Sequence, residues 1–240
     1  MKADPADLTR LLELQQMDTT VDHLRHQASS LPVHKTIATV SAAHDDAGAG
    51  LIAARTRLAD AEVEAERAEA DVVPVKQRLE RNQARVDSGE VQAKALATAL
   101  EEIDHLHRRI SDLEDAQLAA MDLVETTNTE VATLTAKVAE LDRELRTLVS
   151  TRDGQVAELS KQARQVAQER AALQSRLPAP LLSLYEKIRA RSGGIGVARL
   201  EGRRCSGCGL EVNITDYNRY VAAAPDEVLR CAECDRILVR

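Results

Sequence analysis

The only cysteines in this chain are four residues within its last 36 positions. They form two C-x-x-C pairs, Cys205 with Cys208 and Cys231 with Cys234, which are separated by 22 residues. Two such pairs at this spacing predict one tetrahedral Zn²⁺ site, in which each pair forms a tight knuckle whose two thiolates face the metal. Four buried thiols or two disulfides are the alternatives, and the confinement of all cysteine to two identical spacings argues against both. A redox C-x-x-C site needs a thioredoxin-like βαβ context, which the sequence lacks.

The predicted zinc ion is structural, because four cysteines complete its coordination sphere and leave no position for water or substrate. The segment 199–240 is close to the length below which a chain needs a staple to fold, so metal binding and folding should be coupled there. We therefore expect a small β zinc ribbon. Loss of zinc, for example in Cys231→Ser, should unfold the ribbon and leave the helical signal of the chain almost intact.

Local patterns predict the elements of this ribbon. Gly209 and Asp235 each follow the second cysteine of a knuckle, where a positive φ is often required. Glycine adopts it easily, and aspartate is among the few other residues that tolerate it. A helical turn is expected from Thr215 to Ala223, ended by Pro225. Four short strands are expected at Val197–Glu201, Leu210–Ile214, Glu227–Arg230 and Ile237–Val239.

The rest of the chain has the composition of a coiled coil. Phe and Trp are absent, and Ala, Leu, Glu, Arg and Val dominate. Fifteen positions spaced alternately by three and four residues include thirteen apolar side chains, which predicts a heptad seam. After Leu148 the seam slips by one residue through Arg152 to Val156, a stutter that locally unwinds a supercoil. The seam positions are Ala99, Ile103, Leu106, Ile110, Leu113, Gln117, Ala120, Val124, Thr127, Val131, Leu134, Val138, Leu141, Leu145 and Leu148.

Helix boundaries follow from proline and turn residues. Asp4 and Pro5 predict an N-cap and a first helical residue, and this helix should run to about Ser30. Pro32 interrupts it, and Pro74 should kink the second helix, expected over 34–86. The only convincing turn before residue 150 is at 87–90. Reflection about that turn places Pro32 opposite residue 146, close to the slip in the seam.

We therefore predict a mainly α fold: a long kinked antiparallel coiled-coil hairpin followed by a small C-terminal β zinc ribbon. The hairpin should occupy 1–176, with its turn near 87–91 and its break near 31–33. A basic neck or linker should follow over 177–198, and the ribbon over 199–240. A compact helical bundle and a parallel dimer through the seam are the alternatives, and a monomer is favoured.

Charge is distributed unevenly. The chain has a net charge of −7, yet the segment from Arg176 onward contains 11 basic and 8 acidic residues. Most of this positive charge lies between the coiled coil and the ribbon, where a basic cluster can bind phosphates. The backbone amides of the glycine-rich loop 193–196 can do the same. A solvated linker and a flexible turn are the simpler interpretations. Tyr217 and Tyr220 either stack on bases or belong to the ribbon core. The candidate nucleic-acid contacts are Lys187, Arg189, Arg191, Arg199, Arg203 and Arg204.

Enzymatic and membrane functions have little support in the sequence. No phosphate loop, nucleophile elbow or acid–base pair is present, and the pairs His23/His26 and His105/His107 are best interpreted as solvated helical residues. No apolar run reaches the roughly 18 residues that span a membrane, and no secretory signal begins the chain. From the missing catalytic motifs we expect a protein that is not an enzyme. We also expect it in the cytoplasm, because free thiolates that bind zinc suit a reducing compartment.

As a set, these features resemble a bacterial family that combines a coiled-coil hairpin with a C-terminal four-cysteine zinc ribbon, long catalogued as a domain of unknown function. The resemblance covers nearly the whole chain. It implies zinc at the four cysteines and a role as adaptor or chaperone-like factor, with suspected nucleic-acid binding. Asp235 departs from the usual glycine, and residues 92–95 depart from a more polar stretch beside the tip. The resemblance rests on Leu14-Gln15-Gln16-Met17-Asp18, Ser88-Gly89, the run Arg108 to Asp115, both knuckles, and Arg236-Ile237-Leu238.

Two functions are compatible with these observations. The first is a non-enzymatic, zinc-binding adaptor whose coiled coil binds protein partners and whose ribbon and basic neck bind protein, RNA or DNA. The alternative is a transcription regulator that contacts RNA polymerase through the acidic tip of its coiled coil, Asp87 and Glu90. Purification with specific macromolecules would support the first, and altered transcription in vitro the second.

Overall fold

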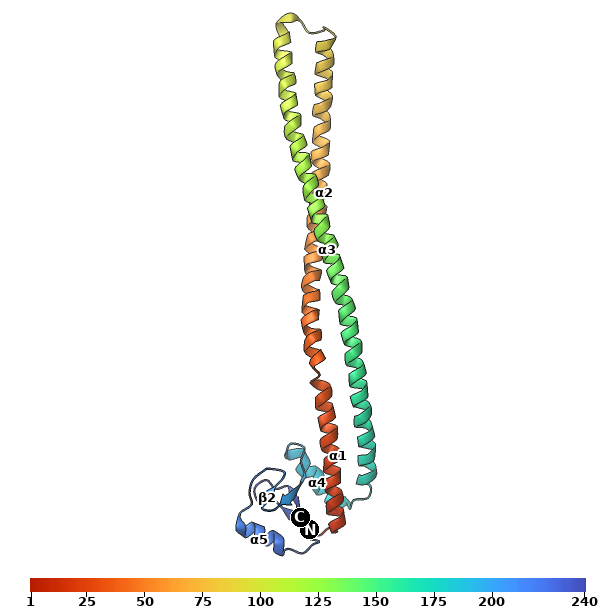
Figure 1. The fold of residues 1–240 in the computed structure, drawn as a ribbon, viewed down its shortest axis with the longest axis vertical. Coiled ribbons are helices and arrows are strands. Elements are labelled where there is room, and N and C mark those ends of the chain that lie inside the picture. Colours follow the sequence, from red (N-terminus) through yellow and green to blue (C-terminus); the bar gives the residue numbers. More distant parts are fainter. The chain divides into compact units, whose positions relative to one another are not determined.

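The computed structural model describes residues 1–240 and contains five helices and four short strands (Figure 1). None of the five helices combines the length with the apolar character that a membrane-spanning helix requires. The elements are α1 (Pro5–Ser29), α2 (Pro32–Asp87), α3 (Ala93–Gln174), α4 (Ala179–Arg191), β1 (Val197–Glu201), β2 (Arg204–Cys205), α5 (Ile214–Ala222), β3 (Leu229–Arg230) and β4 (Ile237–Val239).

The chain forms two compact units. The hairpin unit is Lys35–Val149, and the ribbon unit combines Met1–His34 with Ser150–Arg240. In the hairpin unit, α2 and α3 run antiparallel and are joined by ion pairs, such as Arg57 with Glu130 at 2.6 Å and Lys76 with Glu114 at 2.6 Å. All four of these side chains are largely exposed, so the pairs fix register more than they stabilise. They confirm that the hairpin forms within one chain.

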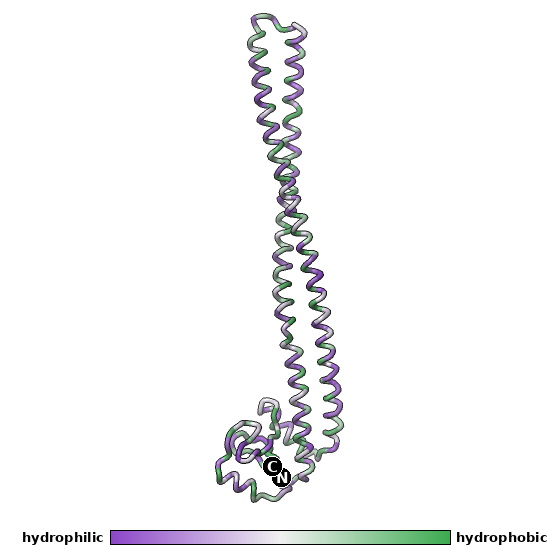
Figure 2. The backbone as a smooth tube through the Cα atoms, viewed as in Figure 1, coloured by the Kyte–Doolittle hydropathy of each residue, from purple (hydrophilic) through white to green (hydrophobic).

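The predicted heptad seam is the buried face of α3. Each of its fifteen positions is buried or half-buried, including the two polar ones, Gln117 and Thr127. Thr127 satisfies its hydroxyl inside its own helix, because it donates to the carbonyl of Leu123 at 2.7 Å. Figure 2 shows hydrophobic and hydrophilic residues alternating along the paired helices. The period read from the sequence therefore identifies the packed face residue by residue.

The predicted helix boundaries are also confirmed. Asp4 caps α1 by accepting a hydrogen bond from the amide of Ala6 at 2.8 Å, and Pro5 is the first helical residue. The chain breaks between α1 and α2 at Leu31, and the tip lies between Asp87 and Ala93. Within the tip Gly89 has a φ of 73°. Helix α2 continues through Pro74 without interruption.

The predicted partner of the Pro32 break is wrong by about nine residues. Leu31 and Pro32 line a groove together with Gln155, Glu158 and Leu159, rather than facing residue 146. The same offset is already present within the hairpin unit, where Arg57 pairs with Glu130, because the tip extends to Ala93 and the centre of the hairpin lies a few residues beyond the turn assumed at 87–90. The break nevertheless lies beside the stutter, as expected.

The small sheet of the ribbon unit has the strand order β2-β1-β4-β3. Strand β1 pairs antiparallel with β2 and parallel with β4, with Val197 opposite Ile237. The strands predicted at Val197–Glu201 and Ile237–Val239 are confirmed, and β3 occupies the end of the predicted 227–230 run. The strand predicted at 210–214 is absent, because only Glu211 forms an isolated bridge, with Arg204, before α5 begins.

The segment 177–198, expected to be a basic linker, is instead packed structure. It contains α4, whose inner face is fully buried, and the start of β1. Basic residues dominate the sequence pattern here, but only Lys187 and Arg191 are exposed on α4, and Arg189 is half-buried. The buried residues of α4 are Leu181, Tyr185 and Ile188.

The ribbon and the helices share one hydrophobic core. Three leucines of α1 pack with the buried face of α4 and with Val197, Ile237 and Val239 of the sheet. A smaller core between the sheet and α5 includes Tyr220 and two of the cysteines. The N-terminal residues extend the sheet edge, since Ala3 donates its amide to the carbonyl of Asp226 at 2.8 Å. The ribbon is therefore not an independent module, in contrast to the sequence prediction. The α1 leucines are Leu8, Leu11 and Leu14.

Candidate metal centre and the polar cluster beside it

The fold brings the four cysteines together. Their Sγ atoms all lie within 4.8 Å of one another, and those of Cys205 and Cys234 are 3.9 Å apart. Four thiolates around Zn²⁺ at about 2.3 Å would be separated by about 3.8 Å, so this arrangement fits a zinc ion closely. Cys205 and Cys231 are buried, and the other two are half-buried.

Each knuckle closes through the same backbone hydrogen bond. The amide of Gly209 donates to the carbonyl of Cys205 at 2.8 Å, and that of Asp235 donates to the carbonyl of Cys231 at 2.9 Å. Both closing residues have a positive φ, 73° for Gly209 and 62° for Asp235, as the sequence predicts. The Asp235 carboxylate also forms ion pairs with Arg191 and Arg230, which bind it to α4 and β3. Aspartate at this position therefore adds contacts that glycine could not make.

The electrostatics of the cluster suit a cation. Without metal, burial raises the pKa of Cys231 to about 12 and also raises the pKa of Cys205. Burial acts in the same direction on Cys234, but the amide and guanidinium of Arg236 outweigh it and lower its pKa to about 7. Backbone amides within each knuckle also donate to the sulfurs. Four thiolates with amide donors behind them form a closed structural site, and one bound Zn²⁺ would supply the cross-link between the two knuckles.

Tyr220 supports the second knuckle. It is only 1% exposed, its hydroxyl donates to the carbonyl of Arg230 at 2.8 Å, and it accepts from the amide of Ala232 at 3.0 Å. This tyrosine is therefore part of the ribbon core and cannot stack on a base. Tyr217 is half-buried, and with Leu200 and Val221 it lines a groove between α5 and the end of β1.

Two of the six basic residues proposed to contact nucleic acid have partners inside the protein. The Arg189 guanidinium lies 2.8 Å from Asp22 and 3.4 Å from Asp18. Arg191 forms an ion pair with Asp235. Both arginines therefore serve the packing of α4.

The other four remain at the surface. Lys187, Arg199 and Arg204 are exposed and form no side-chain hydrogen bond or ion pair, and Arg203 makes only a long hydrogen bond, of 3.5 Å, to the carbonyl of Val212. Three of the four lie in the β1–β2 hairpin, which ends at Cys205, the first residue of the first knuckle. The basic surface is thus smaller than the sequence indicates, and most of it belongs to the ribbon.

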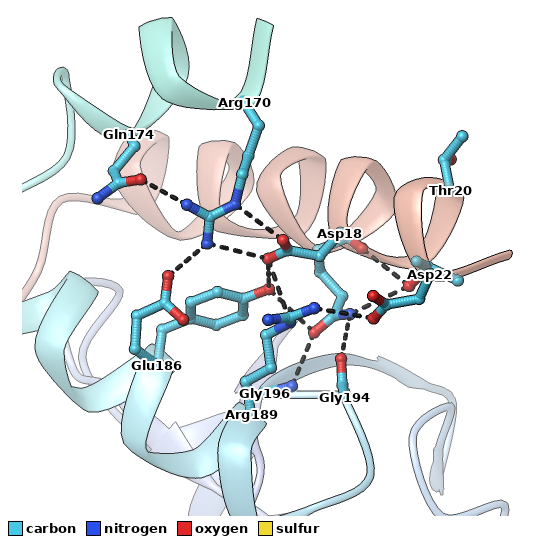
Figure 3. Close-up of polar contacts among 12 residues, drawn as sticks. Asp18, Thr20, Asp22, Arg170, Gln174, Glu186, Arg189, Gly194 and Gly196 are labelled. Carbon is cyan, nitrogen blue, oxygen red and sulfur yellow. Dashed lines mark hydrogen bonds and ion pairs between the residues drawn. The ribbon is translucent and has the colours of Figure 1, made fainter. Parts of the chain in front are cut away.

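A buried polar cluster beside the ribbon was missed by the sequence prediction. At its centre lies Asp18, whose side chain is only 6% exposed (Figure 3). Asp18 accepts hydrogen bonds from Arg170 Nε at 2.8 Å and from the Tyr185 hydroxyl at 2.6 Å. Arg170 also pairs with Glu186. A single carboxylate of α1 therefore connects α3 and α4.

Gln15 completes this cluster by binding the loop that leads into β1. Its amide nitrogen donates to the carbonyl of Gly194 at 2.9 Å, and its amide oxygen accepts from the amide of Gly196 at 2.7 Å. One side chain thereby replaces the two backbone hydrogen bonds that a neighbouring strand would make. The glycine-rich loop is consequently fixed against α1. The amides of Gly194 and Gly196 donate to Arg189 and Gln15, so these two are not free to bind phosphate as expected from the sequence.

The cluster shifts the ionisation of its members. Burial is the largest effect on Tyr185 and raises the pKa of its hydroxyl, an effect increased by the neighbouring Asp18 carboxylate. The hydrogen bond that Arg170 donates to Asp18 raises the pKa of Arg170. The site could have been predicted from the sequence, because Gln15 and Asp18 interrupt the apolar face of α1 at positions three residues apart.

Comparison with known proteins agrees with this geometry. The profile of the CT398-like coiled coil hairpin domain matches residues 14–193, and that of the C4-type zinc ribbon domain matches residues 204–238. The chain belongs to the CT398-like coiled coil hairpin family. The CT398-like domain includes α4, so its extent agrees with the packing of that helix rather than with the linker predicted from the sequence. Every member of the polar cluster except Gly194 and Gly196 lies inside it.

Relatives of this CT398-like protein are found in mycobacteria. An uncharacterised protein of Mycobacterium tuberculosis is 33% identical over all 240 residues and 98% of its own length. A second, from Mycobacterium leprae, is 25% identical, and the alignment covers 93% of this chain and 96% of the relative. A solved structure from Mycobacterium smegmatis has a TM-score of 0.87 at 32% identity, with full coverage of both chains.

More distant structures share the fold. CT398 from Chlamydia trachomatis has a TM-score of 0.56 at 18% identity, and the match covers 97% of both chains. HP0958 from Helicobacter pylori has a TM-score of 0.53 at 15% identity, and the match covers 98% of both. The predicted family, fold class and single structural Zn²⁺ are therefore confirmed.

Proposed function

We propose that this protein is a non-enzymatic adaptor that joins a protein partner on its helical hairpin to a second partner on its ribbon unit. The observation that carries this proposal is the hydrophobic core shared by α1, α4 and the ribbon sheet. Because Leu11, Leu14 and Ile237 are fully buried in it, the ribbon cannot reorient without exposing that core. A partner bound to the ribbon would therefore keep a fixed orientation relative to α1.

The hairpin unit supports the protein-binding part of the proposal. Its two helices bury one seam against each other and leave their outer faces open, including several large apolar side chains. Exposed Leu and Met side chains on a helix are common anchors for partner helices. The most exposed examples on α3 are Leu118 at 60%, Met121 at 54% and Leu123 at 52%.

The ribbon supports binding of an anionic partner, either a nucleic acid or an acidic protein. Lys187, Arg199, Arg203 and Arg204 keep their charges free for such a partner. Thiolate-bound zinc favours a reducing environment, which supports the cytoplasm as the place of action.

Crosslinking and affinity capture of the tagged full chain from its own cells, with and without RNase, tests the proposal. We expect a bound macromolecule that is lost in the double variant Arg203→Glu/Arg204→Glu. The matched control is Arg108→Glu/Arg109→Glu, which reverses an adjacent pair in the hairpin unit. If the macromolecule captured by the wild type also disappears after RNase treatment, the ribbon partner is RNA. If it persists after RNase treatment, the ribbon partner is a protein. Recovery that neither double variant changes would contradict a role for the ribbon surface.

The second candidate is a transcription regulator that contacts RNA polymerase. It is supported by the exposed acidic residues Asp87 and Glu90 at the tip between α2 and α3. Transcription in vitro with the wild-type chain and with Asp87→Asn tests it. An effect of the wild type that the variant lacks is expected under this candidate, and equal transcription in both reactions would exclude contact through the tip.

A further inference from the structure

Helix α1 and the C-terminal part of α3 enclose an open groove within the ribbon unit. The groove has a volume of about 750 Å³, and its floor consists of apolar side chains from both helices. A second groove, of about 540 Å³, includes Leu31 and Pro32 and shares Leu159 with the first. The helices are thus incompletely packed along this stretch. The floor of the larger groove is made by Leu24, Ala28, Val156, Leu159, Ala163 and Ala167.

The cause is visible in the sequence of the two helices. The seam slips here, and it places Arg152 where the heptad pattern calls for an apolar side chain. The facing floor positions Ala28 and Ala163 are too small to fill the space between helices. Beyond this stretch, Asp18 and Arg170 bridge the two helices at 2.8 Å, so the helices cannot close the groove by sliding together without disturbing a buried ion pair.

The rim of the groove is basic. Arg164 is exposed and has no hydrogen bond or ion pair, and Arg25 makes only a weak contact of 3.8 Å with Asp22. Arg152 and His34 also line the groove, and the single acidic residue there, Asp153, is already paired with Arg152 at 2.8 Å. The charge left for a ligand is therefore positive on a chain whose net charge is −7.

We propose that this groove binds an amphipathic helix of a partner protein, with an apolar stripe on the floor and Asp or Glu residues beside the rim arginines. From Arg152 to Ala167 the groove extends for about 22 Å, the length of about four helical turns. A helix laid there would supply the third side of a bundle and fill the space that the alanines leave. The complementary charge comes from the partner, since Arg25 and Arg164 have few acidic neighbours. The inference rests on the proposed adaptor function and gives it a site.

A selection experiment tests the proposal. A phage-displayed library of helical peptides, each about four to five turns long, is selected on the full chain and counter-selected on Ala163→Leu, which fills the floor. An enriched peptide is then synthesised, and its Kd is measured by fluorescence polarisation. Arg164→Glu reverses the rim charge, and Lys161→Glu is the matched control, because Lys161 is exposed on the same helix but lines neither groove.

We expect enriched peptides with apolar residues at i, i+3 or i+4 and i+7 flanked by Asp or Glu. The Kd should weaken about tenfold or more in Arg164→Glu and change less than about twofold in Lys161→Glu. The proposal would be overturned if basic peptides were enriched, if the enriched peptides still bound Ala163→Leu, or if the two charge reversals had equal effects on the Kd. A dimer in sedimentation that Ala163→Leu abolishes would also overturn it, because a second copy would then occupy the groove. If Ala163→Leu retains every partner in the crosslinking capture, the groove proposal fails while the adaptor function stands.

Discussion

Tyr185 of α4 donates a 2.6 Å hydrogen bond to Asp18 of α1, and both side chains are almost completely buried. This contact connects the helix that precedes the ribbon to the first helix of the chain. Gln15, one turn earlier on α1, binds the loop between α4 and β1. The orientation of the ribbon is therefore determined by polar contacts of α1 as well as by the shared hydrophobic core.

Removal of the Tyr185 hydroxyl should destabilise the ribbon unit. In Tyr185→Phe the Asp18 carboxylate loses one donor while it stays buried, which should lower the free energy of unfolding by about 1–2 kcal/mol. Because all three tyrosines lie in the ribbon unit, tyrosine fluorescence during urea unfolding reports on this unit. Tyr217→Phe is the control and should change stability by less than about 0.5 kcal/mol. Equal effects of the two variants would argue against the hydrogen bond as a stabilising contact.

The same hydroxyl predicts a loss of stability at alkaline pH. The pKa of Tyr185 is raised in the folded protein, mainly by burial, whereas an unfolded tyrosine ionises near pH 10. Its stabilising contribution is therefore complete below about pH 10 and decreases above it, by up to about 1.4 kcal/mol per pH unit, until the raised folded pKa is reached. Urea unfolding between pH 9 and pH 11 should show this slope in the wild type and a shallower one in Tyr185→Phe. Parallel curves for the two proteins would mean that Tyr185 ionises normally.

Gly196 should not tolerate a side chain. A Cβ there would lie 2.7 Å from Tyr185 Cδ2 and 2.8 Å from the Tyr185 carbonyl oxygen, so Gly196→Ala should cost about 2 kcal/mol or more. Gly154 in α3 has open space around it, and Gly154→Ala should stabilise by up to about 1 kcal/mol because alanine favours helix. Thermal unfolding of both variants gives opposite shifts in Tm if the packing at Gly196 is as described.

Asp235 combines an unfavourable backbone conformation with favourable ion pairs. Asp235→Ala and Asp235→Gly both remove the contacts to Arg191 and Arg230, but only glycine adopts a φ of 62° without strain. The alanine variant should therefore be less stable than the glycine variant by about 1 kcal/mol or more. Chemical unfolding of the zinc-loaded variants measures this difference. Identical stability of the two would show that the second knuckle does not require a positive φ.

Zinc removal should affect helices as well as the ribbon. Strand β4 contributes Ile237 to the core that contains Leu11 and Tyr185, so loss of the knuckles exposes apolar surface of α1 and α4. After chelation, hydrogen exchange should increase in the ribbon, in α4 and in the first half of α1, while 35–149 remains protected. Cys231→Ser without chelator should reproduce this pattern. Increased exchange confined to 199–240 would support the independent ribbon expected from the sequence alone.

Much of this protein follows from sequence periodicity and spacing. The fifteen seam positions predicted the packed face of α3, because heptad packing depends on contacts that repeat every three or four residues. The two C-x-x-C pairs predicted a zinc site, since metal coordination requires specific ligand types at short spacing. The positive φ of Asp235 was predicted for the same reason: a knuckle imposes its backbone geometry locally.

Tertiary structure alone decided which charged residues form ion pairs within the protein. Charge counts marked Arg189 and Arg191 as surface contacts, yet both pair with aspartates of distant segments, Asp22 and Asp235. Asp18 and Arg170 are separated by 152 residues, and no local pattern links them. The sequence by itself determined the helical hairpin and the metal ligands, because these depend on local repeats. Only the tertiary structure decided that the ribbon is fixed to α1 and α4, because that depends on contacts between residues far apart in the chain.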